Sequence, residues 1–232
     1  MSSHPHILIA GASRGIGLGL VKACVSAGWT VYALARSLAG SAELKTFAEQ
    51  HSRQVSLIEC DLLQADAAQL IKNAIGPQRL QAVLLNAGIS GPAHQDPQQA
   101  TATDIGTLFH LNAVAPIGLA QQLTDLVEPG GVIAFTSSQM GSLQLNRAQH
   151  MPLYGASKAA LNSLLLSWSS TYEQLPWSLL AIHPGWVRTD MGGPNATLSV
   201  EESTQGIIHT ISAHQGRNHC AFVDYQNADM PW

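Results

Sequence analysis

A glycine-rich turn near the start of the chain constrains the fold more than any other feature. The apolar run 6–10 is typical of a buried strand, and it leads directly into Gly11, Gly15 and Gly17, after which 18–27 has a helical pattern. This order of elements can hold a dinucleotide, because glycines let the backbone approach a pyrophosphate and the helix N-terminus offers unpaired N–H groups. The glycine spacing differs from that of the commonest dinucleotide-binding fingerprint, Gly-x-Gly-x-x-Gly. An ordinary structural turn is therefore the alternative.

Strand and helix patterns alternate along the rest of the chain, with no linker or repeat between them. The further strands are expected at 29–35, 54–60, 80–86, 130–136, 177–182 and 221–224, and the further helices at 41–51, 65–75, 97–127, 153–172 and 200–213. This alternation predicts a Rossmann-like, doubly wound α/β fold: a seven-stranded parallel sheet with helices on both faces. A length of 232 residues suits a single domain over 1–232.

Composition excludes several classes of protein. The net charge is −4 and the basic residues are scattered, which argues against nucleic-acid binding. No apolar run approaches the ~20 residues that span a membrane, and the N-terminus lacks the regions of a secretory signal. Three isolated cysteines indicate free thiols in a reducing compartment, so we expect a cytoplasmic protein. The ten histidines follow no ligand pattern, and we expect no metal.

Tyr154 and Lys158 are candidates for proton transfer. In a helical pattern, a spacing of four positions places both side chains on one face. A free phenol, with a pKa near ~10, is a poor acid–base group at neutral pH, and a neighbouring ammonium is expected to lower that pKa. A solvated helix face is the alternative for such a pair taken alone.

Six motifs occur in the order typical of the short-chain dehydrogenase/reductase family, which the chain resembles over about residues 6–225. They are Gly11-x-x-x-Gly15-x-Gly17, Asn86-Ala87-Gly88, Asn112, Ser138, Tyr154-x-x-x-Lys158 and Pro184-Gly185. The stretch 183–193 and the closing Pro231-Trp232 are similar to the C-factor branch, which is close to the sniffer-type carbonyl reductases.

The resemblance implies a catalytic set. Tyr154 would give a proton to the carbonyl oxygen, and Lys158 would lower the tyrosine pKa and bind the nicotinamide ribose. Ser138 would stabilise the developing oxyanion, and it is preferred to the preceding serine because the family's serine stands three residues before a glycine, here Gly141. Asn112 would hold a water, or else make only a local backbone bond.

The coenzyme is expected to be NADP. Arg36 follows the second strand where an acidic residue would favour NAD, no carboxylate comes before Glu43, and Arg14 lies inside the glycine turn. Asp61 would bind the adenine amino group, cap the next helix, or do both. The full set of expected coenzyme-binding residues is Gly11, Ser13, Arg14, Gly15, Ile16, Gly17, Arg36, Asp61, Leu62, Asn86, Ala87, Gly88, Tyr154, Lys158, Pro184, Gly185, Val187 and Thr189.

The expected substrate pocket is largely apolar, and it favours a hydrophobic aldehyde or ketone. It comprises Gln139, Met140, His150, Met151, Trp186 and Met191, under a mobile lid around 190–200. The sequence therefore predicts an NADPH-dependent carbonyl reductase. The alternative is a C-factor-like dinucleotide-binding signalling or regulatory protein in which turnover is incidental. The low charged fraction, 11%, suits burial between subunits, and the resemblance implies a homodimer or homotetramer.

Overall fold

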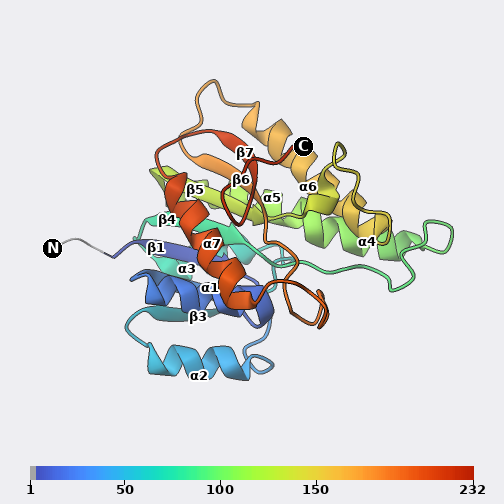
Figure 1. The fold of residues 1–232 in the computed structure, drawn as a ribbon. Helices are drawn as coiled ribbons and strands as arrows, with labels where there is room; N and C mark the ends of the chain where they lie inside the picture. The colour runs from blue at the N-terminus through green and yellow to red at the C-terminus, as the bar shows by residue number, and fades with distance from the viewer. Residues whose placement is uncertain (1–3) are drawn as a thin grey trace.

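The computed structural model describes residues 4–232 and is built on one seven-stranded parallel sheet (Figure 1). Its strands are β1 (His6–Ala10), β2 (Thr30–Ala35), β3 (Val55–Glu59), β4 (Leu80–Leu85), β5 (Val127–Thr136), β6 (Ser178–His183) and β7 (Cys220–Asp224). They lie in the order β3-β2-β1-β4-β5-β6-β7, and each neighbouring pair is parallel. The predicted fold class is confirmed. The order reverses between β1 and β4, and the crevice at such a switch point is where α/β sheets bind ligands.

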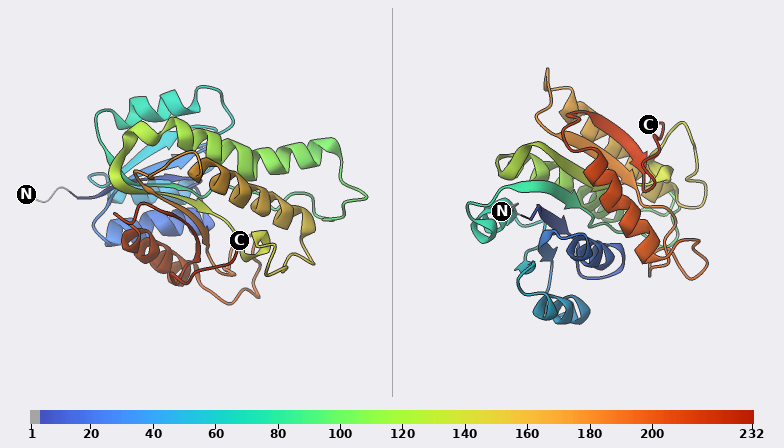
Figure 2. Two further views of the ribbon diagram at one scale, coloured as in Figure 1. Left: turned by 90° about the horizontal axis from the view of Figure 1, so that it is seen from above. Right: turned by 60° about the vertical axis from the view of Figure 1, so that its left-hand side comes forward.

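The described residues form seven α-helices, most of which cover the two faces of the sheet. They are α1 (Gly15–Ser26), α2 (Ala42–Gln50), α3 (Ala67–Ile75), α4 (Ala102–Phe109), α5 (Ala115–Gln122), α6 (Pro152–Ser169) and α7 (Val200–Ala213). Side chains alternate between faces along each strand: Leu8 packs with α3, α5 and α6, whereas Ile7 and Ile9 pack with α1, α2 and α7. Figure 2 shows these two groups of helices on opposite sides of the strands.

The predicted long helix over 97–127 is wrong in its bounds and in its continuity. Helix α4 starts only at Ala102, where Thr101 and Asp104 form a capping box. A π-helical turn, η1 (His110–Val114), then separates α4 from α5, and Val127 already belongs to β5. Single π turns inside helices are frequent at functional sites, and this one carries Asn112.

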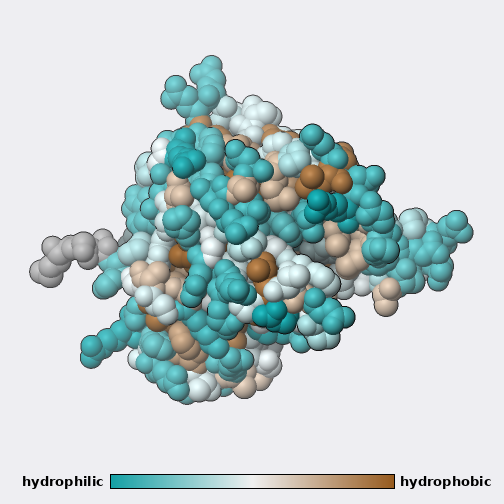
Figure 3. All heavy atoms as spheres, in the orientation of Figure 1, coloured by the Kyte–Doolittle hydropathy of each residue, from teal (hydrophilic) through white to brown (hydrophobic). Residues whose placement is uncertain are grey.

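The surface is mostly polar on the face drawn in Figure 3, with hydrophobic residues scattered across it. Among residues 4–232, none of the helices combines the length and the apolar character that crossing a bilayer requires.

Candidate active site

The glycine turn brings the loops after β1 and β4 into direct contact. Gly11 has φ +82°, and a Cβ on it would lie 2.8 Å from the backbone of Ala87. A Cβ on Gly17 would overlap the Gly11 carbonyl and lie 2.9 Å from the side-chain nitrogen of Asn86. Arg14, at the N-cap of α1, makes no side-chain bond to the first N–H groups of that helix. The turn therefore combines a close backbone approach with a helix N-terminus that lacks a side-chain cap, as a pyrophosphate cradle requires.

Arg14 reaches across the crevice to the segment after β6. Its guanidinium pairs with Asp190 at 2.7 Å, and the two side chains are 80% and 81% exposed. Arg36 is exposed just beyond β2. Sequence reasoning missed Glu59, which pairs with the last residue of β2 across the sheet and accepts a hydrogen bond from the Leu38 N–H at 2.6 Å. A carboxylate thus lies near Arg36 although it is distant along the chain.

Asp61 follows β3 as predicted, but it does not cap the next helix. Its carboxylate accepts from the Leu63 N–H at 3.0 Å, and α3 begins later, at Ala67. The helix-cap alternative is therefore wrong. Leu62 packs against the core cluster to which α3, α5 and α6 contribute.

Ser138, Tyr154 and Lys158 meet beside the end of β5. Tyr154 is the third residue of α6, and one turn later the Lys158 Nζ lies 5.8 Å from the centroid of the tyrosine ring. Gly141 lets the 3₁₀ turn after Ser138 rest on α6, since a Cβ there would lie 2.8 Å from the Lys158 backbone. The preference for Ser138 has a structural reason, because the Ser137 hydroxyl is buried and donates to Asn162 at 2.7 Å.

Burial dominates the titration of the central pair. It raises the pKa of Tyr154 to about 12, and a hydrogen bond with Ser138 opposes part of that rise. It also lowers the pKa of Lys158 to about 8, because this residue is only 3% exposed and burial disfavours its charged form. The sequence-based expectation of a lowered tyrosine pKa is wrong for this structure, because burial raises that pKa by more than the hydrogen bond with Ser138 lowers it.

Lys158 is connected to the glycine turn by a chain of hydrogen bonds. Its ammonium donates to the Thr136 carbonyl at 2.8 Å, and the Thr136 hydroxyl donates to Asn86 at 3.0 Å. The Asn86 amide donates in turn to the Gly11 carbonyl at 3.2 Å. The candidate proton-transfer pair and the candidate cradle therefore form one structural unit.

Asn112 lies in the same unit. A Cβ on Gly88 would lie 3.2 Å from the Asn112 side-chain oxygen and 3.5 Å from the Lys158 Nζ. Asn112 is buried; it accepts from the Ile89 N–H at 2.9 Å and donates to the Ile89 carbonyl at 2.8 Å and to Ser157 at 3.0 Å. These backbone bonds reach a different strand-end loop, so the alternative of a purely local bond is wrong.

The segment after β6 is folded back on itself. Gly185 has φ +82°, and Val187 pairs with Leu198 in an isolated bridge. The Pro184 carbonyl accepts from Ser203 of α7 at 2.6 Å, and the methyl group of Thr189 would lie 3.3 Å from a Cβ on Gly15. The segment after β6 therefore meets the glycine turn where Thr189 lies against Gly15.

The six predicted pocket residues lie on two separate loops at the carboxyl edge of the sheet. Gln139 and Met140 form part of the 3₁₀ turn η3 (Gln139–Gly141), His150 and Met151 directly precede α6, and Trp186 and Met191 lie in the segment after β6. His150 is exposed, and Trp186 and Met191 are about half exposed. Sequence reasoning missed Arg147, whose guanidinium donates to Gln139 at 3.2 Å.

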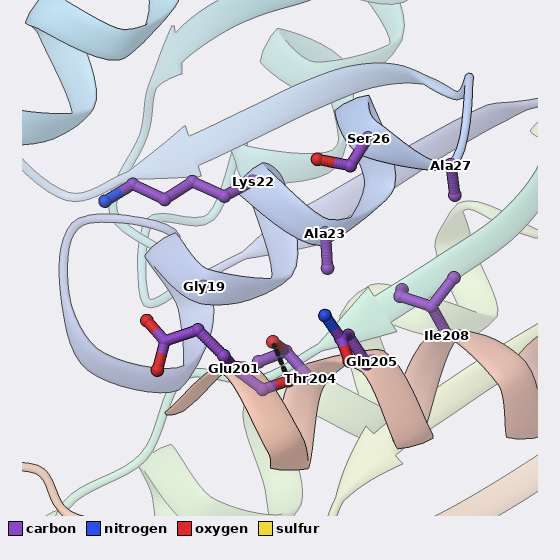
Figure 4. A pocket seen from close by; sticks show the side chains of 9 residues that line it. All are labelled: Gly19, Lys22, Ala23, Ser26, Ala27, Glu201, Thr204, Gln205 and Ile208. Carbon is purple, nitrogen blue, oxygen red and sulfur yellow. Dashed lines mark hydrogen bonds between the residues drawn. The ribbon is translucent and has the colours of Figure 1, made fainter. Parts of the chain in front are cut away.

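Another groove lies between α1 and α7, outside this site (Figure 4). Mostly small and polar residues line it, together with Ile208, and it contains none of the residues predicted for coenzyme or substrate. In the part of the chain that the structure describes, no cluster of three or more histidine, cysteine or acidic side chains could hold a metal.

Comparison with known proteins identifies the family. Residues 5–198 match the model described as short chain dehydrogenase. The chain belongs to the short-chain dehydrogenase family. A curated relative, the C-signal of Myxococcus xanthus, is 35% identical over 151 residues, which cover 63% of this chain and 89% of the relative. The resemblance inferred from the six motifs is confirmed.

Solved structures of the family agree with this fold. A carbonyl reductase from Pseudomonas aeruginosa PAO1 in complex with NADP is 49% identical with a TM-score of 0.95, covering 99% of this chain and 100% of that one. The carbonyl reductase Sniffer of D. melanogaster is 31% identical with a TM-score of 0.89, covering 99% and 100%. The chain thus belongs to a family of oxidoreductases, and its structural neighbours include carbonyl reductases.

Proposed function

We propose that this protein is an NADPH-dependent carbonyl reductase that acts on apolar aldehydes or ketones. When bound, NADPH supplies the hydride that adds to the carbonyl carbon. The observation that carries the proposal is the meeting of Ser138, Tyr154 and Lys158 at the carboxyl edge of the sheet, in one hydrogen-bonded unit with the glycine turn.

The residues divide the chemistry between them. As the carbonyl oxygen gains negative charge, the Tyr154 phenol gives it a proton, and the Ser138 hydroxyl donates a hydrogen bond to it. A phenol with a pKa of about 12 remains protonated at neutral pH and is ready to donate. The Lys158 ammonium then stabilises the phenolate that is left, and a water held by Asn112 returns the proton from solvent.

The coenzyme would bind along the crevice at the switch point. The glycine turn and the N-terminus of α1 would hold the pyrophosphate, and Pro184 to Thr189 would line the nicotinamide. Arg14 and Arg36 would bind the 2′-phosphate, with Arg14 exchanging its bond to Asp190 for one to the phosphate. The NADP complex of the Pseudomonas carbonyl reductase, at 49% identity, supports this choice of coenzyme.

The direct test is NADPH oxidation at 340 nm against a panel of aliphatic and aromatic aldehydes and ketones. We expect turnover that Tyr154→Phe lowers by about a thousandfold or more, with NADPH affinity similar to wild type, because only the proton donor is lost. Tyr172→Phe, at an exposed position three residues after the end of α6, is the matched control. Unchanged turnover in Tyr154→Phe would refute the proton-donor role.

The similarity to the C-signal of Myxococcus xanthus supports a second candidate, a dinucleotide-binding signalling or regulatory protein. The presence of Ser138, Tyr154, Lys158 and Asn112 in one site favours the enzyme, since binding alone does not need all four. A protein that binds NADPH tightly but turns over no member of the panel would favour the second candidate.

A homodimer or homotetramer remains part of the proposal. Val114, next to the start of α5, and Leu164 and Leu166 of α6 are large apolar side chains that are 36% to 51% exposed in the isolated chain. Light scattering at micromolar protein concentration measures the oligomeric state directly.

A further inference from the structure

We propose that Gln95 is a positioning residue for Tyr154, acting as the cap of helix α6 from a loop 59 residues earlier in the chain. The Gln95 side-chain oxygen accepts a hydrogen bond from the Tyr154 N–H at 3.0 Å. The effect of this cap on turnover rests on the proposed reductase function, whereas the capping contact can be tested without that function.

Helix α6 begins without a cap of its own. The first N–H groups of a helix have no partner within the helix, and a side chain just before it usually supplies one. Here Met151 occupies the N-cap and makes no side-chain bond, and Pro152 at the first position has no N–H. Tyr154 is the third residue of α6, the position that a local cap would serve, and Gln95 takes that place.

Gln95 is itself held in one orientation. Its side-chain nitrogen donates to the Ser90 carbonyl at 2.8 Å and to the Pro92 carbonyl at 2.9 Å. These two acceptors fix which end of the amide carries the nitrogen, so the oxygen must face the Tyr154 N–H. Gln95 is 8% exposed and has φ +54°, a conformation that costs energy for a non-glycine residue and persists where its surroundings impose it.

The backbone carbonyl of Tyr154 is also linked to the loop that carries Gln95. Its carbonyl accepts from the Ser157 hydroxyl at 2.7 Å, and Ser157 accepts from Asn112 at 3.0 Å. Asn112 binds both the N–H and the carbonyl of Ile89. Segment 89–95 is thus linked to Tyr154 at its N–H directly and at its carbonyl through two side chains.

This double link bears on catalysis because the phenol is carried on that peptide unit. A displacement of about 1 Å at a reacting group can lower a rate by about a hundredfold. Without Gln95 the first turn of α6 is free to fray, and the phenol spends less time where it can reach the carbonyl oxygen. The glycine turn and both arginines lie on other elements, so we expect coenzyme affinity to depend much less on this cap than turnover does.

The test compares Gln95→Met, which keeps the length of the side chain but neither donates nor accepts effectively, with Gln98→Met, an exposed glutamine of the same loop. In Gln95→Met we expect the Tyr154 amide to exchange with solvent at least about tenfold faster, and kcat to fall about tenfold. We also expect NADPH affinity to stay within about twofold, and the solvent deuterium isotope effect on kcat to rise because proton transfer becomes slower. Gln98→Met should match wild type in all four measurements.

Gln95→Glu separates capping from stability of the loop. It keeps an oxygen for the Tyr154 N–H but gives up both donors to the Ser90 and Pro92 carbonyls. We expect a lower Tm with an isotope effect and Tyr154 amide exchange near wild type, and this variant decides the case if Gln95→Met does not fold. Wild-type amide exchange and isotope effect in Gln95→Met, or equal losses in Gln95→Met and Gln95→Glu, would overturn the proposal. Absence of turnover in the wild-type protein would refute the reductase, while amide exchange would still report on the cap.

Discussion

The two sides of the crevice are built in different ways. On the coenzyme side, backbone meets backbone: the loops after β1 and β4 touch at Gly11 and Ala87, and Gly17 has no room for a side chain. On the substrate side, side chains hold one segment to itself: Trp186 donates to the Gly192 carbonyl at 2.8 Å, and Arg188 donates to the carbonyls of Ala196 and Thr197. Backbone contacts tolerate almost no substitution, whereas side-chain ties can be exchanged. The substrate side is therefore where specificity can vary without loss of the fold.

The largest effect is expected from Gly17→Ala, which breaks the coenzyme side. The added Cβ would overlap the Gly11 carbonyl and lie 2.9 Å from the Asn86 side chain, so the turn must open. We expect NADPH affinity to fall by about a hundredfold or more, together with a lower Tm. Coenzyme fluorescence titration and thermal unfolding measure the two effects.

The matched control is Gly118→Ala in α5, where an added Cβ meets nothing within 4 Å. Alanine is a better helix former than glycine by roughly 1 kcal/mol, so Tm should stay equal or rise slightly. If both glycine variants behaved alike, the close backbone approach at the turn would not be what limits substitution.

Lys158→Met tests the link between the two sides and has opposite effects on activity and stability. Loss of the ammonium should lower kcat about a hundredfold, because the phenolate left by proton transfer loses its stabilising charge. Stability should rise at neutral pH, since folding buries a cation whose pKa falls from 10.5 to about 8. A gain of about 1 kcal/mol would appear as about 2–4 °C in Tm for a chain of this length.

The sign of this stability effect depends on pH. The unfolded chain binds the Lys158 proton more tightly than the folded chain, so the penalty is complete below pH 8 and disappears as pH rises toward 10.5. The difference in Tm between Lys158→Met and wild type should shrink over that range. The wild-type rate of carbonyl reduction should fall above pH 8 as the ammonium is lost, and Lys158→Met should lack that fall. A constant Tm difference from pH 7 to 10 would contradict a buried, titrating lysine.

The sequence predicted the coenzyme side better than the substrate side for the same structural reason. Glycines, strand ends and a helix start are local signals, and they located the turn, Asn86 and the Tyr154 helix correctly. Contacts between distant segments leave no such signal: the sheet brings Glu59 beside the end of β2, and Gln95 reaches α6 across 59 residues. The break at Asn112 was missed because a π turn keeps helical periodicity on both sides. Burial, which decides the Tyr154 pKa, is likewise a property of the fold.

Arg36→Ala tests a different part of the coenzyme side. Arg36 is an exposed side chain expected to bind the 2′-phosphate, whereas the glycine turn acts through close backbone contacts. A charge-assisted bond to a 2′-phosphate contributes about 1.5–3 kcal/mol, so NADPH affinity should fall about tenfold or more while NADH affinity stays the same. Arg53→Ala, an exposed arginine before β3, is the control and should change neither. Equal losses for both coenzymes would mean that Arg36 does not read the phosphate.

The smallest effect is expected from Asp190→Ala, at the one described ion pair that joins the glycine turn to the segment after β6. Both partners are about 80% exposed, and such pairs contribute about 0.2–1 kcal/mol. Because Asp190 competes with the phosphate for Arg14, its removal should tighten NADPH binding by up to about fivefold, and not weaken it. The gain should vanish at high salt, which screens exposed charges, and should be absent in an Arg14→Ala background. Weaker binding in Asp190→Ala would mean that the Arg14–Asp190 pair holds the coenzyme site in its binding shape.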